Sequence, residues 1–432
     1  MFGGNVEVRA KRTGIMANKK ANAAILELSD EDFPRYSSFR DKLRVLVPVC
    51  LLISFQQGLS QFGVILDNLA QYFPDASQTM IQMVVAAPSA TAIPVSLCSG
   101  ILATFFPRKK IGLAALAIML AGGLLPLFFH GSIYCLLVSS GLIGVAQGLI
   151  ITTSTGMFAE NFYGKDRDFA MGLKQVTDSI GNTIIAVAVG QLCLTAWQLS
   201  YSVYILIIPI IVLVAKYMPM GEPDAKIYSF RQGFKGIRFL LTPHYLFMCV
   251  FMMFCGLSVF GFYLNGSMSV AERGLGDAAL VSIVFSVQNV LTLVFGLAYM
   301  PIASVLKKYT LSVAMGVMCV AYAIFYLGDC VPAFILGGVV WGIGNSLVQS
   351  ASLVYLANVV PKGGYGIGLA VGNAMINVGI SFTPLVVNSL RGAVFGSQSP
   401  TDAFAVIAAF CLLAAVLETL REVLFVRVKA SK

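Results

Sequence analysis

The sequence predicts an all-α integral membrane protein with about twelve transmembrane helices in two six-helix halves. Of the 432 residues, 58% are hydrophobic and only 11% are charged, whereas charged residues make up about a quarter of a typical soluble domain. Apolar segments close to the roughly 20 residues that cross a bilayer as a helix follow one another with short polar connections. These observations predict a helical bundle in a lipid bilayer.

The apolar segments fall into two sets, separated by the longest polar connection. The first set of predicted spans is 45–72, 78–105, 111–129, 132–158, 169–193 and 197–218. The second set is 244–265, 279–304, 309–328, 332–358, 366–390 and 403–426. We therefore expect a tail over 1–43, a six-helix bundle over 44–218, a linker over 219–243, a second bundle over 244–428 and a tail over 429–432.

Basic residues gather in every second connection, beginning with the tail before the first span and the run Arg108-Lys109-Lys110. The other side is expected to hold only Arg273 and Arg391. Cytoplasmic loops carry the excess of Lys and Arg, so we expect a cell-membrane protein with both termini in the cytoplasm. The net charge of +9 is thus explained by topology, and no nucleic-acid partner is expected. The bilayer and a small solute are the expected partners of a monomer.

Polar residues are distributed unevenly among the spans. The third span has no polar side chain between Ile111 and Phe129, and the twelfth has none between Ala403 and Leu417. Spans 3, 6, 9 and 12 are therefore predicted to face lipid, and the polar faces of the other spans are predicted to line one cavity. For a single Ser or Thr, hydrogen bonding between helices is the alternative role. The candidate substrate-binding residues are Gln57, Gln61, Gln147, Lys174, Asn182, Asn265, Asn289, Asn345, Gln349, Asn373 and Asn377.

The most specific local feature is Lys174 with Asp178 in the fifth span. The two residues are four apart and share a helix face, and Asn182 continues that face by one turn. They are expected to be the only clear charges inside the membrane, where an unpaired charge is costly. Three roles are open: a structural ion pair, a proton site on Asp178 with Lys174 beside it, or an anion clamp in which Lys174 binds a substrate carboxylate or sulfonate.

The connection between the second and third spans resembles a family signature. Gly100, Arg108 and Lys109 occupy three positions of the pattern Gly-x-x-x-Asp-Arg-x-Gly-Arg-Lys, whereas Thr104 replaces its acid and Pro107 its second glycine. Together with the two six-helix halves, this resembles the major facilitator superfamily over about residues 44–428. The resemblance implies that helices 1, 4, 7 and 10 line a central cavity and that this loop takes part in gating.

These features predict a secondary active transporter that works by alternating access. We expect a small organic anion as the substrate and consider proton-coupled symport; the alternatives are a uniporter or exchanger of a neutral, sugar-like solute and a drug/proton exporter. There is no GxxxxGK[ST] loop for nucleotide hydrolysis. The only histidines, His130 and His244, do not form a metal or catalytic motif, so neither an enzyme nor a cofactor or metal site is expected.

Overall fold

The computed structural model describes residues 39–56, 58–162, 164–221, 242–359 and 365–430. The chain divides into two compact units, Met1–Leu46 and Val47–Lys432, and every contact given below lies within the second unit. The described residues form helices, and there is no strand among them. The predicted tail and most of the predicted linker lie outside the described residues.

Twelve helical segments among the described residues are long and apolar enough to cross a membrane, which confirms the predicted fold class. The first six spans are formed by α2 (Phe39–Ser54), η1 (Gly58–Ile65) and α3 (Leu66–Tyr72), then α4 (Gln78–Phe105), α5 (Arg108–Phe128), α6 (Ile133–Asn161), α7 (Gly164–Cys193), and η2 (Trp197–Leu206) with α8 (Ile207–Tyr217). The second six are formed by α10 (Pro243–Glu272), α11 (Ala278–Leu297), then α12 (Tyr299–Leu306), η5 (Lys307–Tyr309) and α13 (Thr310–Leu327), α14 (Val331–Val359), α15 (Tyr365–Phe395) and α16 (Pro400–Ala430).

Polar side chains at the connections cap several of these helices. The Ser77 hydroxyl accepts the backbone N–H of Met80 at the start of α4, and Thr242 accepts that of Tyr245 at the start of α10. The Asp277 carboxylate accepts two backbone N–H groups at the start of α11. Caps of this kind satisfy N–H groups that have no partner inside the helix, so the short polar connections also fix where the spans begin.

The first span is not a continuous α-helix. The α-helix ends at Ser54, and the chain continues as the 3₁₀ helix η1 from Gly58 before α3 begins at Leu66. The backbone N–H of Gln56 donates to Ile53 O at 2.8 Å, which is a bond between residues three apart. A discontinuous membrane helix is a feature that transporters use around bound ions and substrates.

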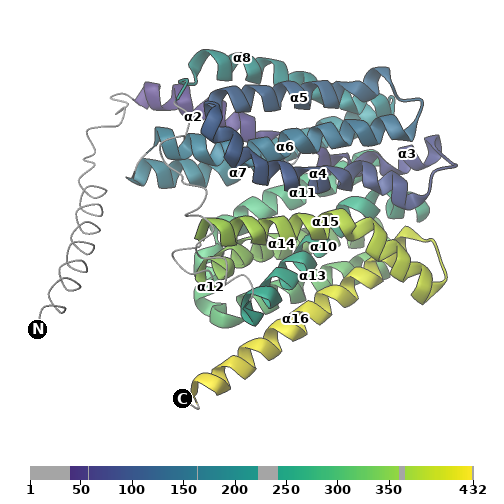
Figure 1. Ribbon diagram of the computed structural model, residues 1–432. Coiled ribbons are helices and arrows are strands. Elements are labelled where there is room, and N and C mark those ends of the chain that lie inside the picture. Colours follow the sequence, from purple (N-terminus) through teal and green to yellow (C-terminus); the bar gives the residue numbers. More distant parts are fainter. Residues whose placement is uncertain (1–38, 57, 163, 222–241, 360–364, 431–432) are drawn as a thin grey trace, which may run out of the picture. The chain divides into compact units, whose positions relative to one another are not determined.

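Two pairs of long helices carry most of the packing between the halves. Helix α4 packs on α15, and α7 packs on α11; these four helices are labelled in Figure 1. The segments η1 and α3 lie against α10. In contrast, α5 packs on α6, η2 and α8, and α13 packs on α14 and α16. Spans 3, 6, 9 and 12 are thus placed away from the junction of the halves, as expected for lipid-facing helices.

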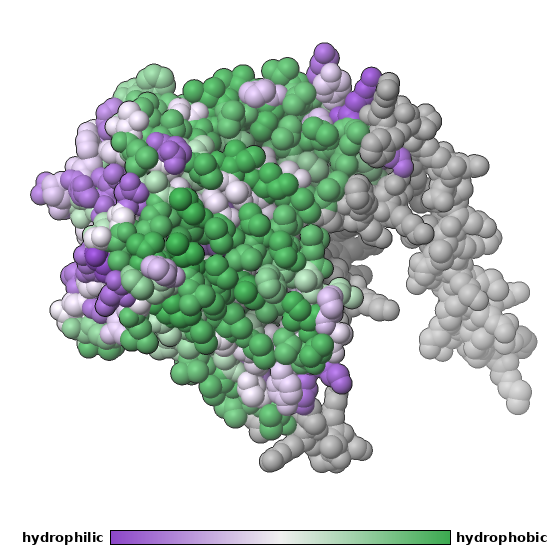
Figure 2. Space-filling model, turned by 180° about the vertical axis from the view of Figure 1, so that it is seen from behind, coloured by the Kyte–Doolittle hydropathy of each residue, from purple (hydrophilic) through white to green (hydrophobic). Residues whose placement is uncertain are grey.

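The outer surface of these peripheral helices is apolar. Exposed large hydrophobic side chains include Val212 on α8, Val320 on α13, and Leu412 and Val416 on α16. Figure 2 shows a broad hydrophobic surface with hydrophilic residues gathered near the ends of the molecule. The surface therefore matches the layered polarity of a bilayer.

The helix ends form two levels, which we name by charge. The basic end carries the α4–α5 turn at Pro107, Lys216 at the end of α8, and η5 with Lys307 and Lys308. The opposite end carries the turns 73–77, 129–132, 273–277, 328–330 and 396–399.

Candidate functional site

At the opposite end, the two halves are joined by amide side chains. The Gln82 amide of α4 donates to Asn265 Oδ1 of α10 at 2.9 Å and to Leu264 O at 3.2 Å. The Gln82 carbonyl accepts from Asn388 Nδ2 of α15 at 2.8 Å. Gln82 and Asn265 are each only 1% exposed. Asn265, a predicted substrate-binding residue, is therefore a member of an inter-half network that we call the amide seal: Gln82, Asn265 and Asn388.

A buried arginine extends this junction. Arg391 of α15 is 0% exposed, and its Nη2 donates to Gln78 Oε1 of α4 at 2.8 Å and to Gln398 Oε1 at 2.9 Å. The burial of Arg391 was not predicted from the sequence. The apolar run was predicted to end at residue 390, whereas α15 continues to Phe395 and keeps the guanidinium inside the protein.

Close backbone packing reinforces the same end. A Cβ added to Gly63 of η1 would lie 2.1 Å from Tyr263 O, and one added to Gly190 of α7 would lie 2.3 Å from Ser282 Cβ of α11. The Ser267 hydroxyl also donates to Val64 O at 2.7 Å across the halves. The opposite end is thus closed by contacts that leave no room for a side chain at these glycines.

A second polar group lies where η1 meets α10 and α11. The Asn289 amide of α11 donates to Gln61 Oε1 of η1 at 3.2 Å. Gln288, next to Asn289, is 0% exposed and lies against Tyr263 of α10. The structure therefore brings together Gln61 and Asn289, both predicted site residues, and adds Gln288, which the sequence analysis did not select.

Toward the basic end, the predicted site residues bond within their own half. Lys174 Nζ donates to Thr155 Oγ1 of α6 at 3.2 Å. In the second half, Gln349 is exposed and donates to Asn345 Oδ1 at 3.0 Å, and Asn377 donates to Asn373 O at 3.0 Å. The hydrogen bonds between the halves described above lie nearer the opposite end, so this region differs from the amide seal.

The predicted contact between Lys174 and Asp178 is not a salt bridge in the structure. Both side chains are described, and they interact only electrostatically, because the Lys174 ammonium is directed to Thr155. Asp178 Oδ1 is buried without a hydrogen-bond partner, and so is Asn182 Oδ1 one turn further along α7. The prediction that Lys174 and Asp178 share one face of the helix is correct. The two side chains do not, however, form an ion pair with each other in the structure.

A family model described as the Major Facilitator Superfamily matches residues 46–276. The chain belongs to the major facilitator superfamily. This confirms the resemblance, and the family and fold are those of secondary transporters rather than enzymes. No curated protein matches the sequence.

Several solved transporter structures share this fold. A mutant of the nucleoside transporter NupG aligns over 87% of this chain and 99% of its own, with a TM-score of 0.72 and 14% identity. PepTSo, a transporter of the POT family, aligns over 89% and 98%, with a TM-score of 0.70 and 13% identity. A bacterial homologue of the human lysosomal transporter Spinster, described as inward-facing and unoccupied, aligns over 91% and 96%, with a TM-score of 0.67 and 13% identity.

The remaining predicted substrate-binding residues occupy different environments. Gln147 of α6 and Asn345 of α14 are each 4% exposed, and the Asn345 amide donates to Thr292 Oγ1 of α11 at 3.3 Å. Asn345 thus also joins two helices of its own half. Gln57 lies outside the described residues.

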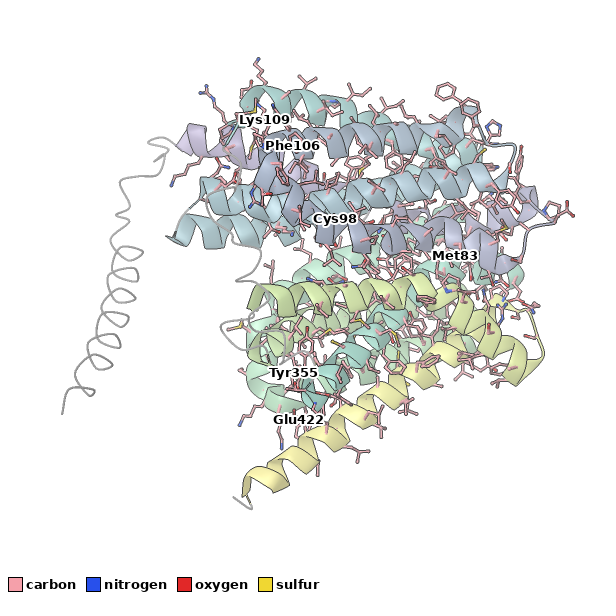
Figure 3. The ribbon with its side chains drawn as sticks, in the orientation of Figure 1. Met83, Cys98, Phe106, Lys109, Tyr355 and Glu422 are labelled. Carbon is pink, nitrogen blue, oxygen red and sulfur yellow. The ribbon has the colours of Figure 1, made fainter. Side chains whose placement is uncertain are left out.

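The loop predicted to take part in gating is held within the first half of this superfamily fold. Arg108 forms a salt bridge with Glu160 at the end of α6. Lys109 Nζ donates to Ala215 O at 2.7 Å and to Met218 O at 2.6 Å at the end of α8, and Figure 3 shows it at the basic end. Gly100 is exposed with nothing within 4 Å of an added Cβ.

Sequence reasoning missed a buried charge cluster in α16. Arg421 Nη2 lies 2.5 Å from Glu418 Oε1 and also pairs with Glu422, and its guanidinium lies 4.2 Å from the centre of the Tyr355 ring of α14. Tyr355 and Glu422 are labelled in Figure 3. The three-residue spacing of Glu418 and Arg421 inside an apolar run is a signal that could have found the pair.

Proposed function

We propose that this protein is a secondary active transporter that moves a small organic anion across the cytoplasmic membrane by alternating access, driven by a cation gradient. In this proposal the basic end faces the cytoplasm, in keeping with the excess of Lys and Arg on cytoplasmic loops. The protein acts as a monomer, and its substrate binds between the two halves near the middle of the bilayer.

The environment of Lys174 supports an anionic substrate. Within the described parts of the chain, its ammonium has one hydrogen-bond partner, the neutral Thr155 Oγ1 at 3.2 Å, although an ammonium group carries three donors. Thr155 itself is exposed, and Lys174 is half-buried. A carboxylate or sulfonate placed there would accept charge-assisted hydrogen bonds, which are about twice as strong as neutral ones.

The unequal contacts along the bundle support alternating access. The amide seal, Arg391 and the close approaches at Gly63 and Gly190 hold the halves together at the opposite end. Exposed polar residues such as Gln349 and Asn373 lie nearer the basic end of α14 and α15. The arrangement is the one expected of a transporter that is closed on one side and accessible from the other.

A flux experiment in proteoliposomes tests the proposal. Purified protein is first screened for thermal stabilisation by organic anions and by uncharged analogues of the same size, and the stabilising compounds are then used for uptake. Lys174→Gln should raise the KM for the anion at least about tenfold, the equivalent of about 1.4 kcal/mol. It should leave the KM of an uncharged analogue unchanged.

Lys308→Gln is the matched control, because Lys308 is an exposed lysine of η5 at the basic end. It should transport like the wild type. If Lys174→Gln transports the anion normally, the anion proposal is wrong and a neutral solute becomes the better candidate. Failure of all tested compounds to move, in protein that stays folded, would count against transport of organic anions altogether.

A further inference from the structure

The turn of α7 that contains Asp178 and Asn182 carries two buried acceptors. Asp178 Oδ1 and Asn182 Oδ1 are buried and have no hydrogen-bond partner, and Asn182 is 7% exposed. The two side chains are four residues apart and therefore share one face of the helix. Both orphaned atoms are acceptors, so what this turn lacks is a donor or a cation.

The end of α2 lies directly against this turn. Three contacts at four-residue spacing set α2 and η1 along α7: Cys50 with Thr177, Ser54 with Gly181, and Gly58 with Ile185. A Cβ added to Gly181 would be only 2.5 Å from Ser54 O. The carbonyl group at the end of α2 is thus brought to α7 between the levels of Asp178 and Asn182.

The broken helix adds further negative potential and a further oxygen. Because α2 ends at Ser54, its C-terminus presents the negative end of the helix dipole at this point. Gln56, two residues beyond that end, has a buried Oε1 that also lacks a hydrogen-bond partner. A buried acceptor without a partner is destabilising, so three of them in adjoining segments require an explanation.

Lys174 does not supply the missing positive charge. Its ammonium donates to Thr155, and no salt bridge joins it to Asp178 in the part of the chain that the structure describes. Among the described residues, the other titratable side chain that interacts with Asp178 is Tyr263, which is a neutral phenol. The carboxylate therefore has no bonded cation of its own.

We propose that this oxygen-lined turn binds a sodium ion. Carboxylate, amide and backbone oxygens are the ligands of hard cations, and membrane transporters coordinate sodium with unwound backbone carbonyls and the C-terminal ends of broken helices. One carboxylate balances one monovalent charge. No group of three or more His, Cys, Asp or Glu residues that could hold a metal occurs among the described residues, which disfavours a divalent ion.

The role of this site rests on the proposed transport function, because the sodium gradient would then drive the transport of the organic anion. Asp178 and Lys174 lie one turn apart on α7. A cation at Asp178 would lower the electrostatic cost of an anion held by Lys174, so each ion favours binding of the other. Such reciprocity is a general property of coupled sites.

Binding of radioactive sodium to the purified full-length protein tests the site without requiring transport. At constant ionic strength, with choline as the replacing cation, we expect saturable binding of about one ion per chain, as one carboxylate implies. Asp178→Asn and Gln56→Leu should each abolish or strongly weaken it. Asp67→Asn, which removes a carboxylate of α3 that accepts from Gln71, is the matched control and should bind sodium normally.

Each result decides the proposal. Absence of saturable binding to the wild type, or equal binding to Asp178→Asn, overturns it. Stabilisation of the wild type by acid but not by sodium, lost in Asp178→Asn, also overturns it and assigns the turn to a proton. Gln56→Leu keeps the test valid if Asp178→Asn does not fold.

Flux measurements separate this proposal from the transport proposal. Sodium binding without flux of any organic anion would refute the transport proposal and leave the ion site intact. Anion uptake that is identical in sodium and choline, with normal uptake by Asp178→Asn, would refute the ion site and leave the transport proposal intact.

Discussion

Replacing Gln82 by leucine should open the opposite end of the protein. Gln82→Leu keeps the approximate size of the side chain but removes every hydrogen bond that Gln82 makes. Asn265 Oδ1, Leu264 O and Asn388 Nδ2 each lose a partner inside a junction where Gln82 is only 1% exposed. When this end opens, the same groups reach water, so the substitution weakens the closed state selectively.

The size of the effect follows from these bonds. Interhelical hydrogen bonds in membranes contribute about 0.6 kcal/mol each on average, and three of them give about 2 kcal/mol. A change of 1.4 kcal/mol is tenfold in an equilibrium constant. The population in which the opposite end is open should therefore rise about thirtyfold.

A buried cysteine reports this population. Ser282 of α11 is 1% exposed and faces Gly190 of α7 across the halves, so Ser282→Cys should react with a membrane-impermeant maleimide only when this end opens. The labelling rate should rise about thirtyfold in the Gln82→Leu background, by the same arithmetic. Gln71→Leu is the matched control, since Gln71 is an exposed glutamine at the same end. An unchanged rate in Gln82→Leu would show that the amide seal does not hold the halves together.

Two further predictions concern packing and buried charge. Arg421→Met should lower the unfolding free energy by about 3–5 kcal/mol, because it leaves the buried Glu418 carboxylate without its partner. Thermal unfolding in detergent measures this loss of stability. A melting temperature equal to that of the wild type would contradict the prediction. Gly63→Ala should slow transport and increase labelling of Ser282→Cys, because the new Cβ would lie 2.1 Å from Tyr263 O. Gly100→Ala has nothing within 4 Å and should behave like the wild type; equal behaviour of the two variants would refute the packing argument.

The sequence was sufficient to predict the spans, because apolar length and the position of charges are local properties. The predicted span 78–105 coincides with α4, and span 331–356 of the structure lies within one residue or two of the predicted 332–358. The break after Ser54 was not predicted, because hydropathy does not distinguish a 3₁₀ segment from an α-helix. Local periodicity reports only the face on which a residue lies.

The hydrogen-bond partners of the site residues could not be predicted, because they depend on how the helices pack against one another. Lys174 and Asp178 were correctly assigned to one face, but the position of Thr155 on a different helix determines where the ammonium points. Gln82 and Asn388 were not selected at all, because their role arises only when α4 and α15 are brought together. The burial of Arg391 was not predicted, because a charged residue normally ends an apolar run, whereas its guanidinium is satisfied by Gln78 and Gln398.

The 3₁₀ segment in the first span also determines how deep its far end lies in the bilayer. A 3₁₀ helix rises about 2.0 Å per residue and an α-helix about 1.5 Å, so the 8 residues Gly58–Ile65 make the span about 4 Å longer than a continuous α-helix would be. This additional length belongs to a segment that packs against both α7 and α10. Rewinding these residues as an α-helix would draw α3 inward by about 4 Å, which is about three-quarters of a helical turn, without breaking a connection.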